Sequence, residues 1–169
     1  MISPDRDPDH GSPRQSGPPL PHDPDLEVDE GPGGVPVAVH LTPRFIALVA
    51  VGGAVGSLAR FGVGELLGTA SGFPIGTLTV NLVGAFALGV LLEWLAVRGS
   101  DAGHRRAARL LLGTGFLGGF TTYSALAVET DALLRDGRLG LALTYALVTV
   151  MVGLVASVAG VLSARAVAR

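Results

Sequence analysis

Residues 113–124 read Gly-Thr-Gly-Phe-Leu-Gly-Gly-Phe-Thr-Thr-Tyr-Ser. Four glycines and three threonines fall within residues 113–122, inside an otherwise apolar segment of membrane-spanning length. Each glycine in a helix interior costs about 1 kcal/mol relative to alanine, and lipid offers no water to a backbone that leaves the helix. Interrupted helices of transport proteins bind ions through freed carbonyl and N–H groups. The motif therefore predicts a broken membrane helix with an ion site.

Further polar side chains interrupt the other apolar segments. Asn81 lies about a third of the way along residues 75–97, and Thr77 lies one turn before it on the same helical face. The amide of Asn81 offers two N–H donors, which suit a small anion, but an interhelical hydrogen bond is an equal alternative. Tyr145 and Thr149 share one face of the last segment. Their hydroxyls either extend a polar line or bond back to their own helix.

Two charged residues also fall within predicted membrane segments. Arg60 lies about two-thirds of the way along the first segment, where a buried cation is expensive and usually functional. The alternative is that Arg60 reaches out to the nearby interface. Glu129 is either interfacial or the anchor of a polar network. Glycines at four-residue spacing on either side of Arg60 allow another helix to approach closely; they are Gly52, Gly56, Gly64 and Gly68.

The elements that must position these residues are helices. Of the 169 residues 49% are hydrophobic and only 15% are charged, whereas soluble domains carry about 25% charged residues. Four apolar segments each reach the ~20 residues that span a bilayer; they are residues 44–67, 75–97, 107–134 and 139–163. The sequence therefore predicts an all-α membrane protein with four transmembrane helices, the third of them broken. One copy encloses little space, so we expect an oligomer.

The N-terminal 40 residues differ from the remainder in composition. Residues 1–40 hold nine of the eleven prolines, together with many Asp and Gly residues. Such a segment buries too little apolar surface to offset its chain entropy, so we predict a disordered tail. It lacks the continuous apolar core of a signal peptide. The transport domain is therefore expected within residues 44–163, with the tail as a cytoplasmic extension.

Arginine placement predicts the orientation in the membrane. Four spans put both termini on one side, which would hold seven arginines against two, Arg135 and Arg138, on the other. We therefore expect a multi-pass protein of the inner (plasma) membrane with cytoplasmic termini. The seven are Arg44, Arg98, Arg105, Arg106, Arg109, Arg165 and Arg169.

Several function classes are disfavoured. The chain has no cysteine, which excludes a disulfide framework and thiolate metal sites. Three of the four histidines lie in the tail and one in a loop, where they form no plausible metal or acid–base site; they are His10, His22, His40 and His104. No catalytic constellation is visible. We expect ion transport within a lipid bilayer, with no enzymatic activity and no nucleic-acid partner.

Three stretches together resemble the small fluoride channels of the CrcB/Fluc family. They are Gly-Gly-Ala-Val-Gly-Ser-Leu-Ala-Arg-Phe at residues 52–61, Gly-Thr-Leu-Thr-Val-Asn-Leu-Val-Gly at residues 76–84, and Gly-Phe-Leu-Gly-Gly-Phe-Thr-Thr-Tyr-Ser at residues 115–124. Their order and spacing are highly specific, and the resemblance covers about residues 44–163. It implies an antiparallel, dual-topology dimer of four-helix subunits, with fluoride pathways along the interface.

The resemblance also implies roles for individual residues. A structural sodium ion at the dimer centre would be held by the main-chain carbonyls of Gly118 and Thr121. Arg60 and Glu129 match the family's first-helix arginine and the acidic residue after the break, which we assign to structure or vestibule. The fluoride pathway would include Asn81 as the pore asparagine, Thr77, Tyr145 and Thr149 as a polar track, and Tyr123 and Ser124 from the broken motif.

One position departs from the family pattern. The family places two phenylalanines three residues apart after the double threonine, and here those positions are Tyr123 and Leu126. The second ring is therefore missing. An antiparallel homodimer also needs a chain that inserts both ways, and seven arginines against two is a clear bias. Both features favour, over a homodimer, a heterodimer with an oppositely oriented paralogue that supplies the missing ring.

These observations rank the functions. The leading interpretation is passive, selective export of cytoplasmic fluoride, which lowers its toxicity. A second is a non-conducting or half-pore subunit of a heterodimeric fluoride channel. A remote third is a small proton-coupled multidrug exporter, which would need a membrane-embedded carboxylate, whereas the first segment carries Arg60 and has Glu65 only near its end.

Overall fold

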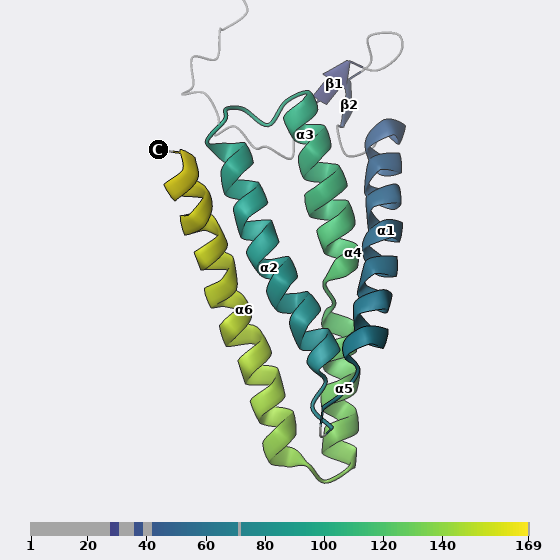
Figure 1. Ribbon diagram of the computed structural model, residues 1–169. Helices are drawn as coiled ribbons and strands as arrows, with labels where there is room; N and C mark the ends of the chain where they lie inside the picture. The colour runs from purple at the N-terminus through teal and green to yellow at the C-terminus, as the bar shows by residue number, and fades with distance from the viewer. Residues whose placement is uncertain (1–27, 31–35, 39–41, 71, 169) are drawn as a thin grey trace, which may run out of the picture. The chain divides into compact units, whose positions relative to one another are not determined.

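The computed structural model describes residues 28–30, 36–38, 42–70 and 72–168. They separate into two compact units, Met1–Ala38 and Val39–Arg169. The second unit is helical (Figure 1). Its elements are α1 (Pro43–Leu67), α2 (Ile75–Ala96), α3 (His104–Ala108), η3 (Arg109–Leu117), α4 (Gly118–Phe120), α5 (Tyr123–Arg135) and α6 (Leu139–Ala168).

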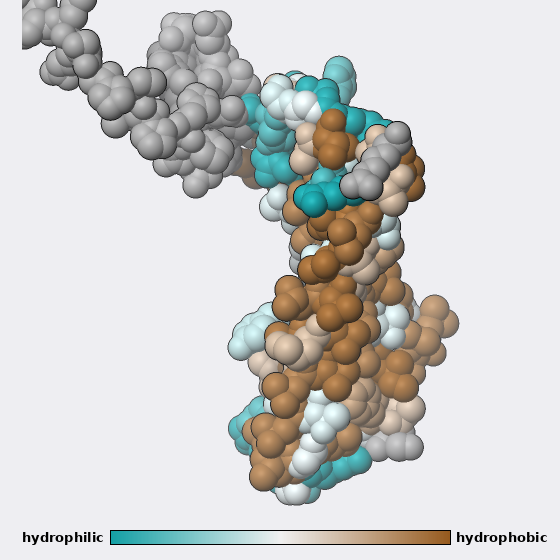
Figure 2. Space-filling model, turned by 90° about the vertical axis from the view of Figure 1, so that its left-hand side faces the viewer, coloured by the Kyte–Doolittle hydropathy of each residue, from teal (hydrophilic) through white to brown (hydrophobic). Residues whose placement is uncertain are grey.

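Four stretches of the helical unit are long and apolar enough to cross a membrane. They are α1, α2, the interrupted run His104–Arg135, and α6. In Figure 2, hydrophobic side chains cover the middle of this unit, and hydrophilic residues gather at its two ends. The predicted all-α membrane fold with four spans is therefore confirmed.

Proline and glycine set the bounds of these helices. Pro43 occupies the first turn of α1, where its missing N–H has no intrahelical partner to lose. Pro74 directly precedes α2. Gly68, at φ 54°, ends α1, and Gly137, at φ 71°, lies in the turn before α6. The last helix continues to Ala168, beyond the predicted end at residue 163.

The helical unit is assembled from two close helix pairs. The helix α2 packs along α6, while α1 packs against η3 and α4. Gly52 and Gly56 of α1 are buried at the second contact. A Cβ on Gly52 would collide with the carbonyl oxygen of Leu111, and one on Gly56 with that of Phe116. The glycine spacing predicted a close helix neighbour, and the structure shows η3 in that position at Gly52 and Gly56. At Gly64 and Gly68 the prediction that glycine makes room for a neighbour is wrong for the described residues, because a Cβ there would meet nothing within 4 Å.

The third span is broken where the threonine pair occurs. Thr121 (φ −78°, ψ 161°) and Thr122 (φ −153°, ψ 127°) are extended between α4 and α5. The predicted break is therefore confirmed. The nine residues before α4, Arg109–Leu117, form a π-helix. This π-helix was not predicted, and it begins before the first glycine of the motif. Such widened turns are rare and often occur at functional sites.

Two short strands lie within the segment for which the sequence predicts disorder. Strand β1 (Val28–Glu30) pairs antiparallel with β2 (Pro36–Ala38). The other residues of the predicted tail, 1–27, 31–35 and 39–40, lie outside the described residues. The disorder of that segment stays a prediction.

Candidate functional site

Asn81 of α2 is bonded to the exposed backbone of the break. Its Nδ2 donates to the carbonyl oxygen of Thr122 at 2.9 Å, and its Oδ1 accepts from the backbone nitrogen of Thr122 at 2.8 Å. One amide side chain therefore satisfies both backbone groups of a buried residue that left the helix. Of the two alternatives stated for Asn81, the interhelical hydrogen bond is present. The second N–H of the amide has no partner among the described residues.

Two carbonyl oxygens near the end of α4 lose their usual N–H donors, because the backbone leaves the helix at Thr121 and Thr122. In a continuous helix the N–H of Thr122 would donate to the carbonyl of Gly118, and the N–H of Ala125 to that of Thr121. Here the first donates to Asn81, and the second donates to the side-chain oxygen of Thr122 at 3.1 Å. Within the described chain no other donor replaces them. The two carbonyls predicted to bind sodium are therefore both available.

A second polar group surrounds Glu129 of α5. Thr77 Oγ1 donates to Glu129 Oε1 at 2.7 Å, and the Tyr145 hydroxyl donates to Glu129 Oε2 at 2.5 Å. Tyr145 is 0% exposed, and Thr77 and Glu129 are half-buried. Each carboxylate oxygen thus accepts from a hydroxyl on a different helix, α2 or α6. Of the two alternatives for Glu129, the structure shows the polar network.

The two polar groups lie one turn apart on α2, because Asn81 belongs to the first and Thr77 to the second. Together they place hydroxyl, carboxylate, amide and backbone groups within otherwise apolar helices. We call Thr77, Asn81, Thr122, Glu129 and Tyr145 the polar column. In the described residues, no buried side-chain nitrogen or oxygen is left without a hydrogen bond.

Two further predicted pathway hydroxyls have local partners. The hydroxyl of Thr149 donates to the carbonyl of Tyr145 at 2.8 Å, so it bonds back to its own helix. This is the second alternative stated for that residue. Ser124 Oγ lies 3.1 Å from Thr122 Oγ1, within hydrogen-bond distance.

Comparison with known proteins places this arrangement in a family. The family model described as "CrcB-like protein, Camphor Resistance (CrcB)" matches residues 47–161. The chain belongs to the CrcB family.

Similar curated proteins share most of the helical unit. "Fluoride-specific ion channel FluC 2" of Leifsonia xyli subsp. xyli is 48% identical over 123 residues, which cover 73% of this chain and 85% of the relative. "Fluoride-specific ion channel FluC" of Caulobacter vibrioides (strain NA1000 / CB15N) is 45% identical over 124 residues, 72% of this chain and 96% of the relative. "Fluoride-specific ion channel FluC 1" of Cutibacterium acnes is 47% identical over 112 residues, 66% of this chain and 78% of the relative.

The two positions of the family's aromatic pair, Tyr123 and Leu126 in this CrcB-family chain, are divided between surface and interior. Tyr123 is 82% exposed, whereas Leu126 is 8% exposed and packs in a cluster with Leu133, Ala142 and Tyr145. The two positions, three residues apart, therefore face different surroundings. The side chain at 126 lies against the same tyrosine that holds Glu129.

Arg60 is placed apart from the polar column. It is half-buried in α1, and among the described residues it has no hydrogen-bond or ion-pair partner. A cation without a partner at membrane depth is costly. The side-chain polar atoms of Arg60 and Tyr123 therefore have no hydrogen-bond partner among the described helices.

Two residues of the site were missed by the sequence reasoning. Phe73, just before α2, meets the Tyr145 ring edge-on, with centroids 5.4 Å apart and planes at 82°. Thr122 is the residue that Asn81 holds, and its side chain also caps α5. A signal for Thr122 was available, because threonine directly before an apolar helix is a favoured N-cap. No sequence signal pairs Phe73 with a residue on the fourth span.

Proposed function

We propose that this CrcB-family chain is a subunit of a fluoride-specific channel, which lets cytoplasmic fluoride leave passively and lowers its toxicity. The observation that carries the proposal is the polar column inside a four-span membrane unit, built around the break in the third span. Its relatives are named fluoride-specific ion channels. Conduction of this kind needs no catalytic group, so the chain is not an enzyme.

The donors of the column suit a small anion. Fluoride is a compact hydrogen-bond acceptor that must exchange its water for other donors. The amide of Asn81 retains one N–H for this purpose and brings no charge that would trap the ion. The hydroxyls of Thr77 and Tyr145 donate to Glu129 at rest. Fluoride and the carboxylate would compete for the same two hydroxyls, which would make each fluoride contact short-lived.

A second subunit would complete the site. Lipid cannot satisfy the free carbonyls of Gly118 and Thr121, the hydroxyl of Tyr123 or the guanidinium of Arg60. A partner packed over these groups would cover them. Sodium fits the freed carbonyls, which are hard oxygen ligands of the kind that interrupted membrane helices offer to this ion. At an antiparallel interface it would hold the carbonyls of two broken helices together.

The partner we favour is an oppositely oriented paralogue, so that this chain is one half of a heterodimer. The arginine bias favours a single insertion direction for this chain, with its termini in the cytoplasm. Leu126 also lacks the ring that the family pattern places there. Relatives whose names carry the numbers 1 and 2, such as those of Leifsonia xyli and Cutibacterium acnes, are in keeping with paired genes.

Fluoride efflux from liposomes tests this proposal. The chain is reconstituted alone and together with a CrcB-family paralogue from the same cell, and efflux is followed with a fluoride electrode, with chloride efflux as the control. We expect selective fluoride efflux from the pair. Robust fluoride efflux from the chain alone would contradict the heterodimer and leave the channel function intact. No selective efflux from either preparation would contradict the channel function.

A further inference from the structure

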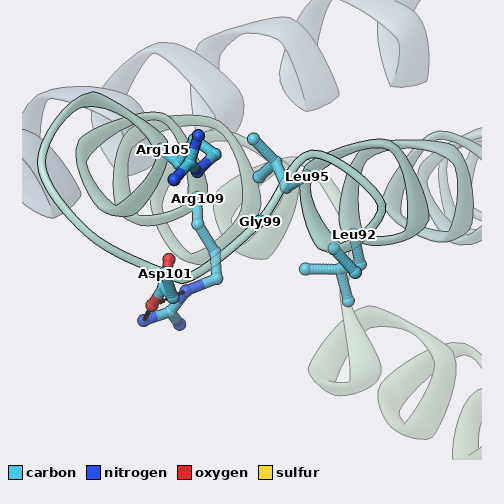
Figure 3. A pocket seen from close by; sticks show the side chains of 7 residues that line it. Leu92, Leu95, Gly99, Asp101, Arg105 and Arg109 are labelled. Atoms are coloured by element: carbon cyan, nitrogen blue, oxygen red, sulfur yellow. Dashed lines mark hydrogen bonds and ion pairs between the residues drawn. The ribbon is translucent and has the colours of Figure 1, made fainter.

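A hollow of about 160 Å³ opens where the second span ends and the third begins. Figure 3 shows its two kinds of wall: leucine side chains from α2 on one side, and an arginine–aspartate group on the other. The lining residues are Leu92, Leu95, Ala96, Gly99, Asp101, Arg105 and Arg109. The polar column lies elsewhere, so this hollow has no part in the proposed pathway.

Its arginines are held in place by the loop before α3. Arg109 donates through Nε to Asp101 Oδ2 at 2.8 Å, and its Nη2 lies 2.6 Å from the same oxygen. Arg105 donates through Nε to the carbonyl of Ser100 at 2.8 Å. Among the described residues Arg105 has no carboxylate partner, so its charge is not neutralised. The guanidinium is thus fixed, charged and facing the hollow beside Gly99.

The surrounding charge has the same sign. Residues 98–109, which comprise the loop that follows α2 together with α3 and the first residue of η3, contain four arginines and one aspartate, an excess of three positive charges. At the opposite end of the helical unit, acidic and basic residues are nearly balanced; they are Glu65, Asp131, Asp136, Arg135 and Arg138. An anion is therefore favoured at one end only.

We propose that this hollow binds the headgroup of an anionic phospholipid. The walls match the two parts of such a molecule, because guanidinium groups bind phosphate through charge-assisted hydrogen bonds, and leucines offer an apolar surface to the first part of an acyl chain. Leu92 is 42% exposed, so lipid can reach this surface. The hollow lies where two membrane spans end, which is the depth of a headgroup.

The bound lipid would fasten this end of the chain to one leaflet. Basic residues near an anionic membrane surface each gain about 1 kcal/mol, which is about fivefold in a binding constant. This attraction adds to the insertion bias of the arginines, since both favour the same end in the anionic cytoplasmic leaflet. The inference does not depend on which ion the protein conducts.

The chain contains a fluorescent reporter for lipid at this end of α2, although it does not line the hollow itself. Trp94, its only tryptophan, lies in the last turn of α2, two residues after Leu92. The full-length chain is reconstituted in bilayers with brominated phosphatidylglycerol or brominated phosphatidylcholine, and quenching of Trp94 fluorescence gives the relative binding constant. We expect about a fivefold preference for phosphatidylglycerol. Equal quenching by the two lipids would overturn the proposal.

Matched variants locate the preference. Arg105→Gln removes the charge that has no carboxylate partner, and we expect the preference to fall close to onefold. Arg135→Gln removes one arginine from the opposite end and should leave the preference near fivefold. The proposal fails if Arg105→Gln retains the full preference, or if Arg135→Gln abolishes it. It also fails if dissolved inorganic phosphate at millimolar concentration removes the preference, because the hollow would then be a site for soluble anions.

Discussion

Replacing Asn81 with alanine removes both hydrogen bonds between α2 and the break. These bonds join Asn81 to the backbone carbonyl and nitrogen of Thr122 at 2.9 and 2.8 Å, and Thr122 is only 8% exposed. Side-chain hydrogen bonds in a membrane protein contribute about 0.6 kcal/mol on average, so two bonds set a lower limit near 1 kcal/mol. A buried backbone group without a partner costs about 1–3 kcal/mol. We expect the free energy of unfolding to fall by about 2–4 kcal/mol.

The assay is reversible unfolding of the purified chain in mixed micelles, with helix content followed by circular dichroism. Val83→Ala is the matched control, because Val83 lies on the same helix and is 53% exposed. Substitutions at such positions usually change stability by less than about 0.5 kcal/mol. A loss for Asn81→Ala no larger than that of the control would refute the reasoning that this side chain holds the broken backbone.

Asn81→Asp separates holding the break from conducting fluoride. An aspartate retains an oxygen that accepts from the Thr122 nitrogen, but it replaces the N–H donor with a second oxygen facing the Thr122 carbonyl. It also places a fixed negative charge beside the pathway. We expect a partial loss of stability and a complete loss of fluoride efflux. Normal efflux from this variant would remove Asn81 from the pathway.

Four further changes test other parts of the site and the N-terminal tail. Tyr145→Phe and Thr77→Val each remove one hydrogen-bond donor to Glu129. Each should lower the free energy of unfolding by about 1.5–3 kcal/mol, since the acceptor is charged. Additive losses in the double variant, measured in mixed micelles, would contradict a carboxylate shared by the two hydroxyls. Gly118→Val should leave the chain folded, because a Cβ there meets only the Gly113 carbonyl at 3.9 Å. The same substitution should abolish assembly. An intact dimer by cross-linking, with unchanged sodium dependence, would count against the carbonyl site. Deleting residues 1–40 should leave fluoride efflux unchanged, and a large loss would overturn our interpretation of the tail.

The positions of the spans could be predicted because their signals are local. Pro74 and Gly137 mark the starts of α2 and α6, and both helices begin at the predicted residues, 75 and 139. The location of the break could also be predicted, since a cluster of glycine and threonine has low intrinsic helix propensity. Its form could not. The π-helix begins at Arg109, in a stretch whose residues are ordinary helix formers, and it lies where α1 packs against the third span.

The pairings inside the site required the structure. The sequence left Asn81 equally suited to an anion or to another helix, and its partner Thr122 is 41 residues away. Glu129 could equally have been interfacial. Its two donors are 52 and 16 residues away, and they meet only because three spans pack side by side. Side-chain chemistry identified the polar residues, whereas their partners depended on packing between helices.

Leu126 shows a different limit of the sequence reasoning. The family pattern identified it as a missing ring, which is a statement about the pathway. In the folded subunit it is a core residue that packs against Tyr145. A phenylalanine at this position would have to displace that core, and overpacking of this kind typically costs about 1–3 kcal/mol. The missing ring and the local packing are therefore linked, which no single-residue comparison could reveal.

The measurement that tests the central claim most directly is fluoride efflux from liposomes that contain this chain together with an oppositely oriented CrcB-family paralogue. The claim is that fluoride passes along the polar column of this chain. It predicts rapid fluoride efflux without chloride efflux, and loss of that efflux when Asn81→Asp is introduced into this chain alone. Efflux that carries chloride equally well, or fluoride efflux that the substitution leaves unchanged, would contradict it.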